Sequence, residues 1–325
     1  MPTLDGLEPV NRVVTQMACT EAALRYLGRD VSAPWLYGAS GHAFVIHIAD
    51  GVCPSGPHTW DGWSTLNGLD ADVGCELERF GPFYREQDAD YEAHREGAWE
   101  FTREAIAEGT PVYGYDFDMG EFYLIHGCEG DAYQYFTVGP GPSDEASLAK
   151  DRLGETGVVP MILMTRVHAA EPADDLTALR DAMRFAIEFS EGGRETDDPK
   201  TSSGLAAYDR WINELQAGEP NAVGQAYNAH AWHECREMAS AFLLAAKDRL
   251  EDDPMELFLA IDAYDRCSDD LRRVCDELPF PSEDDPNPLE DEIHRRTAIM
   301  SLEEAREAER DGVEALKTVL EALEG

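Results

Sequence analysis

Cys19 has the sequence context of a reactive thiol. It lies in Thr15-Gln-Met-Ala-Cys-Thr-Glu-Ala-Ala-Leu-Arg-Tyr-Leu-Gly28, which predicts a short helix that begins with the thiol and ends at the glycine. A thiol at a helix N-terminus faces unpaired amide groups and the positive end of the helix dipole, which stabilise the thiolate and lower the cysteine pKa. The alternative is a structural role, because free cysteine often packs as a small apolar side chain, and Ala22, Ala23 and Tyr26 follow at helical spacing.

The elements around Cys19 predict a mixed α and β domain. A strand is expected over residues 43–48, and a helix over 88–108 that Gly109 stops. Turn residues separate three later apolar runs, which indicates an antiparallel meander with one further strand after it. The predicted strands are 111–115, 121–127, 132–138 and 158–167.

The pattern changes to helical periodicity near residue 174. A polar stretch at 191–203 reads as an exposed loop between the first helix and the rest. The fold class is therefore α+β, with a domain over 1–172 that contains an antiparallel sheet and an all-α helical bundle over 173–325. The predicted helices are 176–190, 204–215, 222–250, 254–278 and 288–323.

The composition is that of a folded, strongly acidic protein. Of 325 residues, 43% are hydrophobic, and 66 acidic against 26 basic residues give a net charge of -40. This charge repels nucleic acid and anionic lipid, so neither is an expected partner, and its spread along the chain is typical of a halophilic protein. The seven cysteines are scattered and the chain shows no apolar membrane span or signal peptide, so we expect a cytoplasmic protein with reduced thiols.

Three short segments together carry a family resemblance. They are residues 19–44, Cys-Pro-Ser-Gly-Pro at 53–57, and Ile125-His-Gly-Cys-Glu-Gly-Asp131. With them the first domain resembles the N-terminal domain of the butirosin-biosynthesis protein H family, and Ser203-Gly-Leu-Ala-Ala-Tyr-Asp-Arg-Trp211 is similar to the helical extension of some members. The resemblance implies a papain-like fold related to bacteriocin-processing cysteine peptidases. It also implies acyl transfer from an acyl-carrier protein to an amine.

The resemblance also implies positions for the catalytic groups. In the peptidase relatives a cysteine lies on the first helix, a histidine begins a later strand, and an acid or amide lies about one strand further on, just before a proline. Carried over, Cys19 is the nucleophile, Glu121 falls at the position of the base, and Val138 or Gly139 falls at the acid position before Pro140. The chain thus departs from the family pattern at two of the three positions.

Two histidines could replace the missing base. His42 lies on the glycine loop Ser40-Gly-His-Ala-Phe44, and His126 lies five residues after Glu121, so a regular strand turns it to the opposite side unless a bulge near Gly127 re-aims it. Either imidazole could equally be an ordinary loop or strand residue, and Glu121 is a poor base for a thiol unless burial raises its pKa. Gln16, one turn before Cys19, could donate to an oxyanion through its side-chain amide.

Another constellation lies on the helix predicted over 222–250. His230, His233 and Glu237 occupy successive turns and could hold a metal with ligands from another helix, although a solvated polar stripe is the simpler interpretation. We therefore predict no metal and no cofactor. The last helix could pair with a second chain, so oligomerisation through the helical domain stays open.

The sequence thus predicts papain-like, thiol-dependent chemistry. Cys19 thiolate would attack a thioester or amide carbonyl of a small molecule or peptide, and the acyl group would pass to an amine or water. The alternative is a non-catalytic ligand- or peptide-binding protein that retains the papain-like cleft, which the departures from the catalytic pattern favour.

Overall fold

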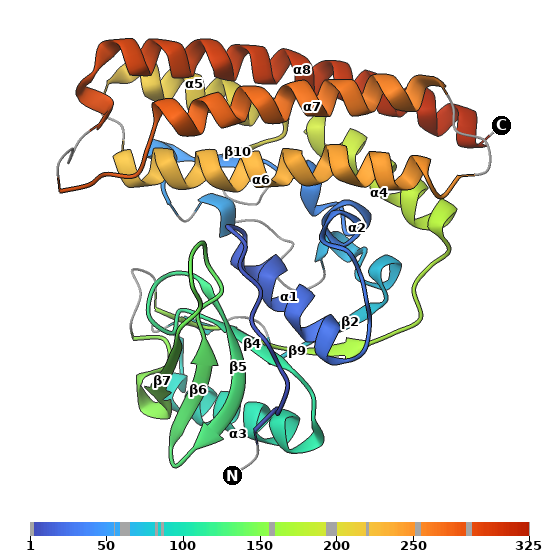
Figure 1. Ribbon diagram of the computed structural model, residues 1–325. Coiled ribbons are helices and arrows are strands. Elements are labelled where there is room, and N and C mark those ends of the chain that lie inside the picture. The colour runs from blue at the N-terminus through green and yellow to red at the C-terminus, as the bar shows by residue number, and fades with distance from the viewer. Residues whose placement is uncertain are drawn as a thin grey trace. The chain divides into compact units, whose positions relative to one another are not determined.

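The computed structural model describes residues 3–54, 56–58, 66–81, 84–85, 88–155, 160–192, 200–218, 221–250, 255–283 and 288–324. The chain is mixed α and β with antiparallel sheets (Figure 1). It forms two compact units, each built from two stretches of sequence. Met1–Ser32 joins Val73–Pro172 in the first, and Ala33–Asp72 joins Ala173–Gly325 in the second.

A six-stranded antiparallel sheet is the centre of the first unit. Its order is β2-β9-β4-β5-β6-β7. The predicted meander is confirmed, since β4, β5 and β6 are antiparallel neighbours in chain order. The strands are β2 (Cys75–Arg79), β9 (Met164–Ala169), β4 (Val112–Tyr115), β5 (Phe122–Glu129), β6 (Ala132–Phe136) and β7 (Glu145–Ala149).

Two helices, α1 (Thr15–Tyr26) and α3 (Tyr91–Glu108), cover opposite faces of this sheet. Tyr113 of β4 reaches α1 through a hydrogen bond from Gln16, whereas Tyr133 of β6 packs edge-on against Trp99 of α3. The strand registers place Tyr113 and Tyr133 on opposite faces, because side chains alternate along each strand. Helix α3 ends where it was predicted to end, at Gly109 with φ +81°.

The strand predicted over residues 158–167 is divided. A short strand β8 (Met161–Ile162) pairs with β3 (Tyr84–Arg85), and β9 then joins the main sheet between β2 and β4. Part of the predicted strand, 158–159, lies outside the described residues.

Helix α1 begins four residues earlier than predicted. Thr15 is its first residue and Cys19 its fifth, so the thiol does not open the helix. Val14 precedes the helix with an extended backbone and no side-chain cap, so no capping residue marks the start of this helix in the sequence. The predicted end of the helix at Gly28 is confirmed, because Gly28 adopts φ +77° two residues after Tyr26, the last helical residue.

Five long helices dominate the second unit, and α6, α7 and α8 pack side by side (Figure 1). The residues of Ala33–Asp72 contribute α2 (Ala33–Ala39) and the short 3-10 helix η1 (His42–Phe44) to the same unit. The long helices are α4 (Asp175–Ser190), α5 (Leu205–Ala217), α6 (Ala222–Lys247), α7 (Met255–Glu277) and α8 (Glu292–Glu324).

The helical unit also contains a small sheet, so it is not all-α as predicted. Strand β1 (His47–Ala49) pairs antiparallel with β10 (Thr201–Ser203), which was predicted as loop. His47 Nδ1 lies 2.7 Å from Ser203 Oγ within this pairing. A three-residue strand is too short to give a readable alternation, and its partner lies more than 150 residues away in the chain.

Close packing joins residues 33–72 to the helices. A Cβ atom on Gly38 of α2 would lie 1.9 Å from the ring of Phe242 on α6, so only glycine allows this approach. Arg236 of α6 donates to the carbonyl oxygens of Ala43 at 3.1 Å and Val45 at 2.7 Å. These contacts tie the chain around η1 to α6.

Candidate functional site

The structure places Cys19 in the interior of the first unit, with 0% of the residue exposed. Burial raises the pKa of the Cys19 thiol well above its ordinary value, and the negative charge of Glu121 raises it further. The predicted lowering of this pKa is therefore wrong. The physical reason is that Cys19 lies in the second turn of α1, beyond the helix end whose amides would stabilise a thiolate.

Thr15 occupies the start of α1 instead, and its hydroxyl contacts Glu121. Thr15 Oγ1 donates to Glu121 Oε2 at 2.5 Å and accepts from the Phe122 backbone N–H at 3.1 Å. Thr15 is buried and Glu121 is half-buried. The first residue of α1 is thus hydrogen-bonded to the residue that precedes β5, and we call Thr15 and Glu121 the hydroxyl–carboxylate pair.

The chain after β6 also lies beside the start of α1. The Arg12 N–H donates to the Val138 carbonyl at 3.1 Å, just before α1 begins. A Cβ atom on Gly139 would lie 3.9 Å from Thr15 Cγ2, which is ordinary van der Waals contact. Glu121 and Gly139, at the positions that the resemblance assigns to the base and the acid, therefore both lie beside Thr15, whereas Cys19, the assigned nucleophile, lies one turn further along α1.

Gln16 was predicted as an oxyanion donor, but its side chain points into the core. Its Nε2 donates to the Tyr113 hydroxyl at 3.4 Å, and both residues are buried. Burial also raises the pKa of Tyr113, so its hydroxyl stays protonated and available as an acceptor. The interaction secures α1 on the sheet.

His126 lies at a β-bulge in β5, between the pairs formed by Ile125 and Gly127. The bulge that the sequence left as an alternative is therefore present. The imidazole stacks on Phe136 with ring centroids 4.3 Å apart, and burial lowers its pKa. Across the part of the chain that the structure describes, no hydrogen bond links His126 to Cys19.

His42 belongs to the second unit, in η1. It is buried, and its ring meets Tyr37 edge-on with centroids 5.9 Å apart. Cys19 and Glu121 belong to the first unit, so the predicted candidates divide between the units.

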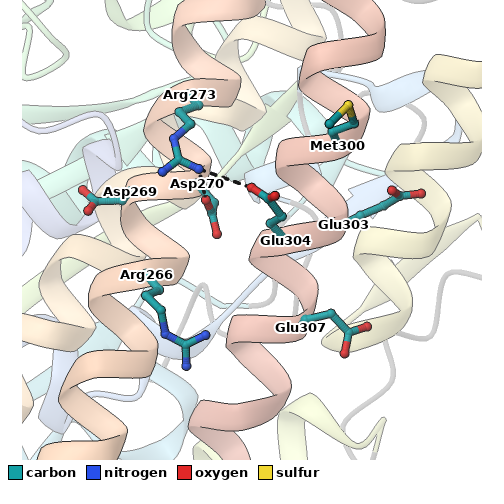
Figure 2. A pocket seen from close by; sticks show the side chains of 8 residues that line it. All are labelled: Arg266, Asp269, Asp270, Arg273, Met300, Glu303, Glu304 and Glu307. Carbon is teal, nitrogen blue, oxygen red and sulfur yellow. Dashed lines mark hydrogen bonds and ion pairs between the residues drawn. The ribbon is translucent and has the colours of Figure 1, made fainter.

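The helical unit carries a polar groove between α7 and α8, shown in Figure 2, with a volume of about 680 Å³. Arg273 crosses it to Glu304 at 3.3 Å and also pairs with Asp270. The groove is lined by Arg266, Asp269, Asp270, Arg273, Met300, Glu303, Glu304 and Glu307.

The side chains proposed for a metal have other contacts. His230 stacks on Phe280, and Arg272 Nε lies 3.4 Å from His233 Nε2. In the described residues, no group of three or more His, Cys, Asp or Glu side chains is placed to hold a metal ion. Nor does any described helix combine the length and apolar character that crossing a bilayer requires.

The sequence matches no protein-family model, and the search of curated proteins found no match. The resemblance to the butirosin-biosynthesis protein H family therefore stays a prediction that rests on the quoted segments.

Thr15 is not identifiable as a site residue from the sequence. It heads the segment 15–28, but no capping residue marks the helix start, since Val14 lacks a side chain that can cap. Only the contact with Glu121, which lies 106 residues further along the chain, identifies Thr15 as part of a site.

Proposed function

We propose that this protein is a non-catalytic binding protein, for a small molecule or a peptide, that retains a papain-like framework. The observation that carries this proposal is the complete burial of Cys19 beside the carboxylate of Glu121. Both effects keep the thiol protonated, and a protonated thiol is neither a nucleophile nor a metal ligand.

The hydroxyl–carboxylate pair supports the same conclusion. A carboxylate has an ordinary pKa of about 4, many units below that of an alcohol, so Glu121 is a weak base for the Thr15 hydroxyl. The hydroxyl also accepts the Phe122 N–H, which occupies it in a structural role. Neither candidate nucleophile near the start of α1 is therefore activated.

The charge of the protein limits the class of ligand. A net charge of -40 repels anions from the protein as a whole and concentrates cations near it. A cationic or neutral ligand fits this field better than a nucleotide, a nucleic acid or an anionic lipid.

Thiol-dependent acyl transfer is the competing prediction, and selective labelling separates the two. The folded protein in high salt is treated with iodoacetamide at several pH values, and each cysteine is followed by peptide mapping. Cys53 is only partly buried and serves as the internal reference. We expect Cys53 to be alkylated first and Cys19 to stay protected until the protein unfolds, with Cys19→Ser as the control for peptide assignment.

Alkylation of Cys19 ahead of Cys53 in the folded protein, with a midpoint below about pH 8.5, would overturn the proposal. Binding itself is tested by thermal-shift screening in high salt, because a ligand that binds only the folded state raises Tm. Hits should shift wild type and Cys19→Ser equally, since the thiol has no chemical role in binding.

A further inference from the structure

Four large apolar side chains are exposed together where α6 ends and α7 begins, on two helices that pack side by side (Figure 1). Between 45% and 74% of each residue is open to solvent, whereas Leu243 and Leu257, beside two of them in the sequence, are fully buried. Both helices therefore complete the core of the unit with other residues. We call the four residues the α6–α7 patch, and they are Leu244, Met255, Phe258 and Leu259.

Helical spacing makes the α6–α7 patch one continuous surface. Met255, Phe258 and Leu259 are three and four residues apart on α7, which places their side chains next to one another. Lys247 connects this row to α6, because its Nζ lies 5.3 Å from the centroid of the Phe258 ring. Leu244 lies one turn before Lys247 on the same side of α6. A contiguous exposed patch marks an interaction surface, in contrast to single apolar residues scattered over a protein.

Acidic side chains border the patch. Asp248 follows the last residue of α6, and Asp262 lies one turn beyond the patch on α7; their side chains are 74% and 71% exposed. Basic side chains nearby already have acidic partners. Lys247 Nζ lies 3.8 Å from Asp248 Oδ1. Arg266 is shared between Asp262 and Asp311, at 3.1 Å from each. The border therefore keeps an excess of negative charge.

We propose that the α6–α7 patch binds a basic amphipathic helix of another protein. The apolar side chains of such a helix recur every three or four residues, which matches the spacing of Met255, Phe258 and Leu259. Lysine or arginine side chains along its edges would reach Asp248 and Asp262, so that charge and apolar contact select the same partner.

A second copy of this chain is a poorer occupant. It would bring the same acidic border against this one, and like charges placed opposite each other oppose association. The net charge of -40 on each copy adds to this repulsion. The proposal does not rest on the proposed function, because the whole patch belongs to the second unit and Cys19 to the first.

The probe is a fluorescein-labelled amphipathic peptide of leucine and lysine, about 14 residues or four turns long. Its binding to the full-length protein is measured by fluorescence anisotropy in about 1 M KCl, where a screening length of about 3 Å removes long-range attraction to an acidic protein. A second peptide has glutamate in place of every lysine, which keeps the apolar side and reverses the charge. We expect the lysine peptide to bind the wild type, and the glutamate peptide to bind at least about tenfold more weakly.

Two double variants locate the binding. Phe258→Gln/Leu259→Gln removes apolar surface from the patch and should weaken binding of the lysine peptide about tenfold or more. The matched control is Ile293→Gln/Met300→Gln, which changes two residues of α8 with similar exposure and should bind as the wild type does. Leu244→Gln, on the other helix, should also weaken binding, and it replaces the first double variant if far-UV circular dichroism shows that this variant does not fold.

The proposal is overturned if the wild type does not bind the lysine peptide, if both peptides bind equally, or if the patch variant and the control variant bind equally. Sedimentation equilibrium in the same salt tests the other occupant. A wild-type monomer supports the proposal, whereas a wild-type dimer that Phe258→Gln/Leu259→Gln dissociates would assign the patch to a second copy and overturn it. Labelling of Cys19 tests a residue of the first unit, so this proposal and the proposed function can fail separately.

Discussion

Arg236 and Glu309 form an ion pair inside the helical unit, with Arg236 Nε 2.5 Å from Glu309 Oε2 and their side chains 0% and 1% exposed. The Tyr208 hydroxyl donates to the same carboxylate at 3.2 Å. Arg236 also bonds the carbonyls of Ala43 and Val45, so one guanidinium connects α6, α8 and the chain beside η1. Helices α6 and α8 and the chain beside η1 are thus joined by polar contacts of a buried charge as well as by apolar packing.

Removing one partner of this pair should be strongly destabilising. We expect Glu309→Leu to lower the free energy of unfolding by about 3–5 kcal/mol, because a buried guanidinium is left without its counter-charge. Urea unfolding in high salt measures the loss. The control is Glu304→Leu, on the same helix α8 as Glu309. It breaks an exposed ion pair with Arg273 of α7 and should cost about 0–1 kcal/mol. Similar losses in the two variants would contradict this account.

Thr15→Val should destabilise the first unit without changing side-chain volume much. It removes the hydroxyl that accepts from the buried Phe122 N–H and donates to Glu121. We expect a loss of about 1–3 kcal/mol, since an unsatisfied buried donor costs its desolvation energy. Thr15→Ser keeps the hydroxyl and should recover most of this loss. If Thr15→Ser is as unstable as Thr15→Val, the methyl group and not the hydroxyl matters at this position.

Acid should destabilise the helical unit through His47. Burial, and secondarily the charge of His42, lowers the pKa of His47 from its ordinary value of 6.5 to about 3. In the unfolded chain His47 therefore binds a proton below about pH 6.5, whereas in the folded chain it binds one only below about pH 3. The contribution of His47 to stability is complete above pH 6.5 and is lost between these values, at up to about 1.4 kcal/mol per pH unit.

Asp72 acts in the opposite direction over part of this range, because burial raises its pKa from 3.8 to about 6. The measurement is therefore the difference between wild type and His47→Gln, in urea midpoints from pH 7 to pH 4. We expect the difference to shrink as the pH falls. A constant difference would show that His47 is not the group responsible.

High salt should stabilise the folded protein. The chain carries 66 acidic and 26 basic residues, and self-repulsion among them opposes compaction at low ionic strength. Screening shortens the range of this repulsion to about 3 Å at 1 M salt. We expect Tm to rise steadily from 0.1 M to several molar KCl, because added salt screens this repulsion. A flat or falling Tm would remove the halophilic interpretation of the charge.

The sequence by itself determined most of the long elements. The helices now seen as α3 to α8 follow from apolar spacing and from Gly, Pro and Asp breaks, and Gly109 and Gly28 ended their helices as predicted. The meander of β4, β5 and β6 was equally readable, because turn residues separate runs that pair with their neighbours in the chain. These features depend on interactions between residues close in sequence.

Tertiary structure alone decided the features on which the site depends. Whether Cys19 is activated or buried depends on what packs over α1, and Thr15 meets Glu121 only because the sheet brings residues 106 positions apart together. The grouping of Ala33–Asp72 with the helices depends in the same way on Gly38, Arg236 and the pairing of β1 with β10. A local pattern sets periodicity and breaks, but burial, charge pairing and proton affinity are set by neighbours that the pattern does not contain.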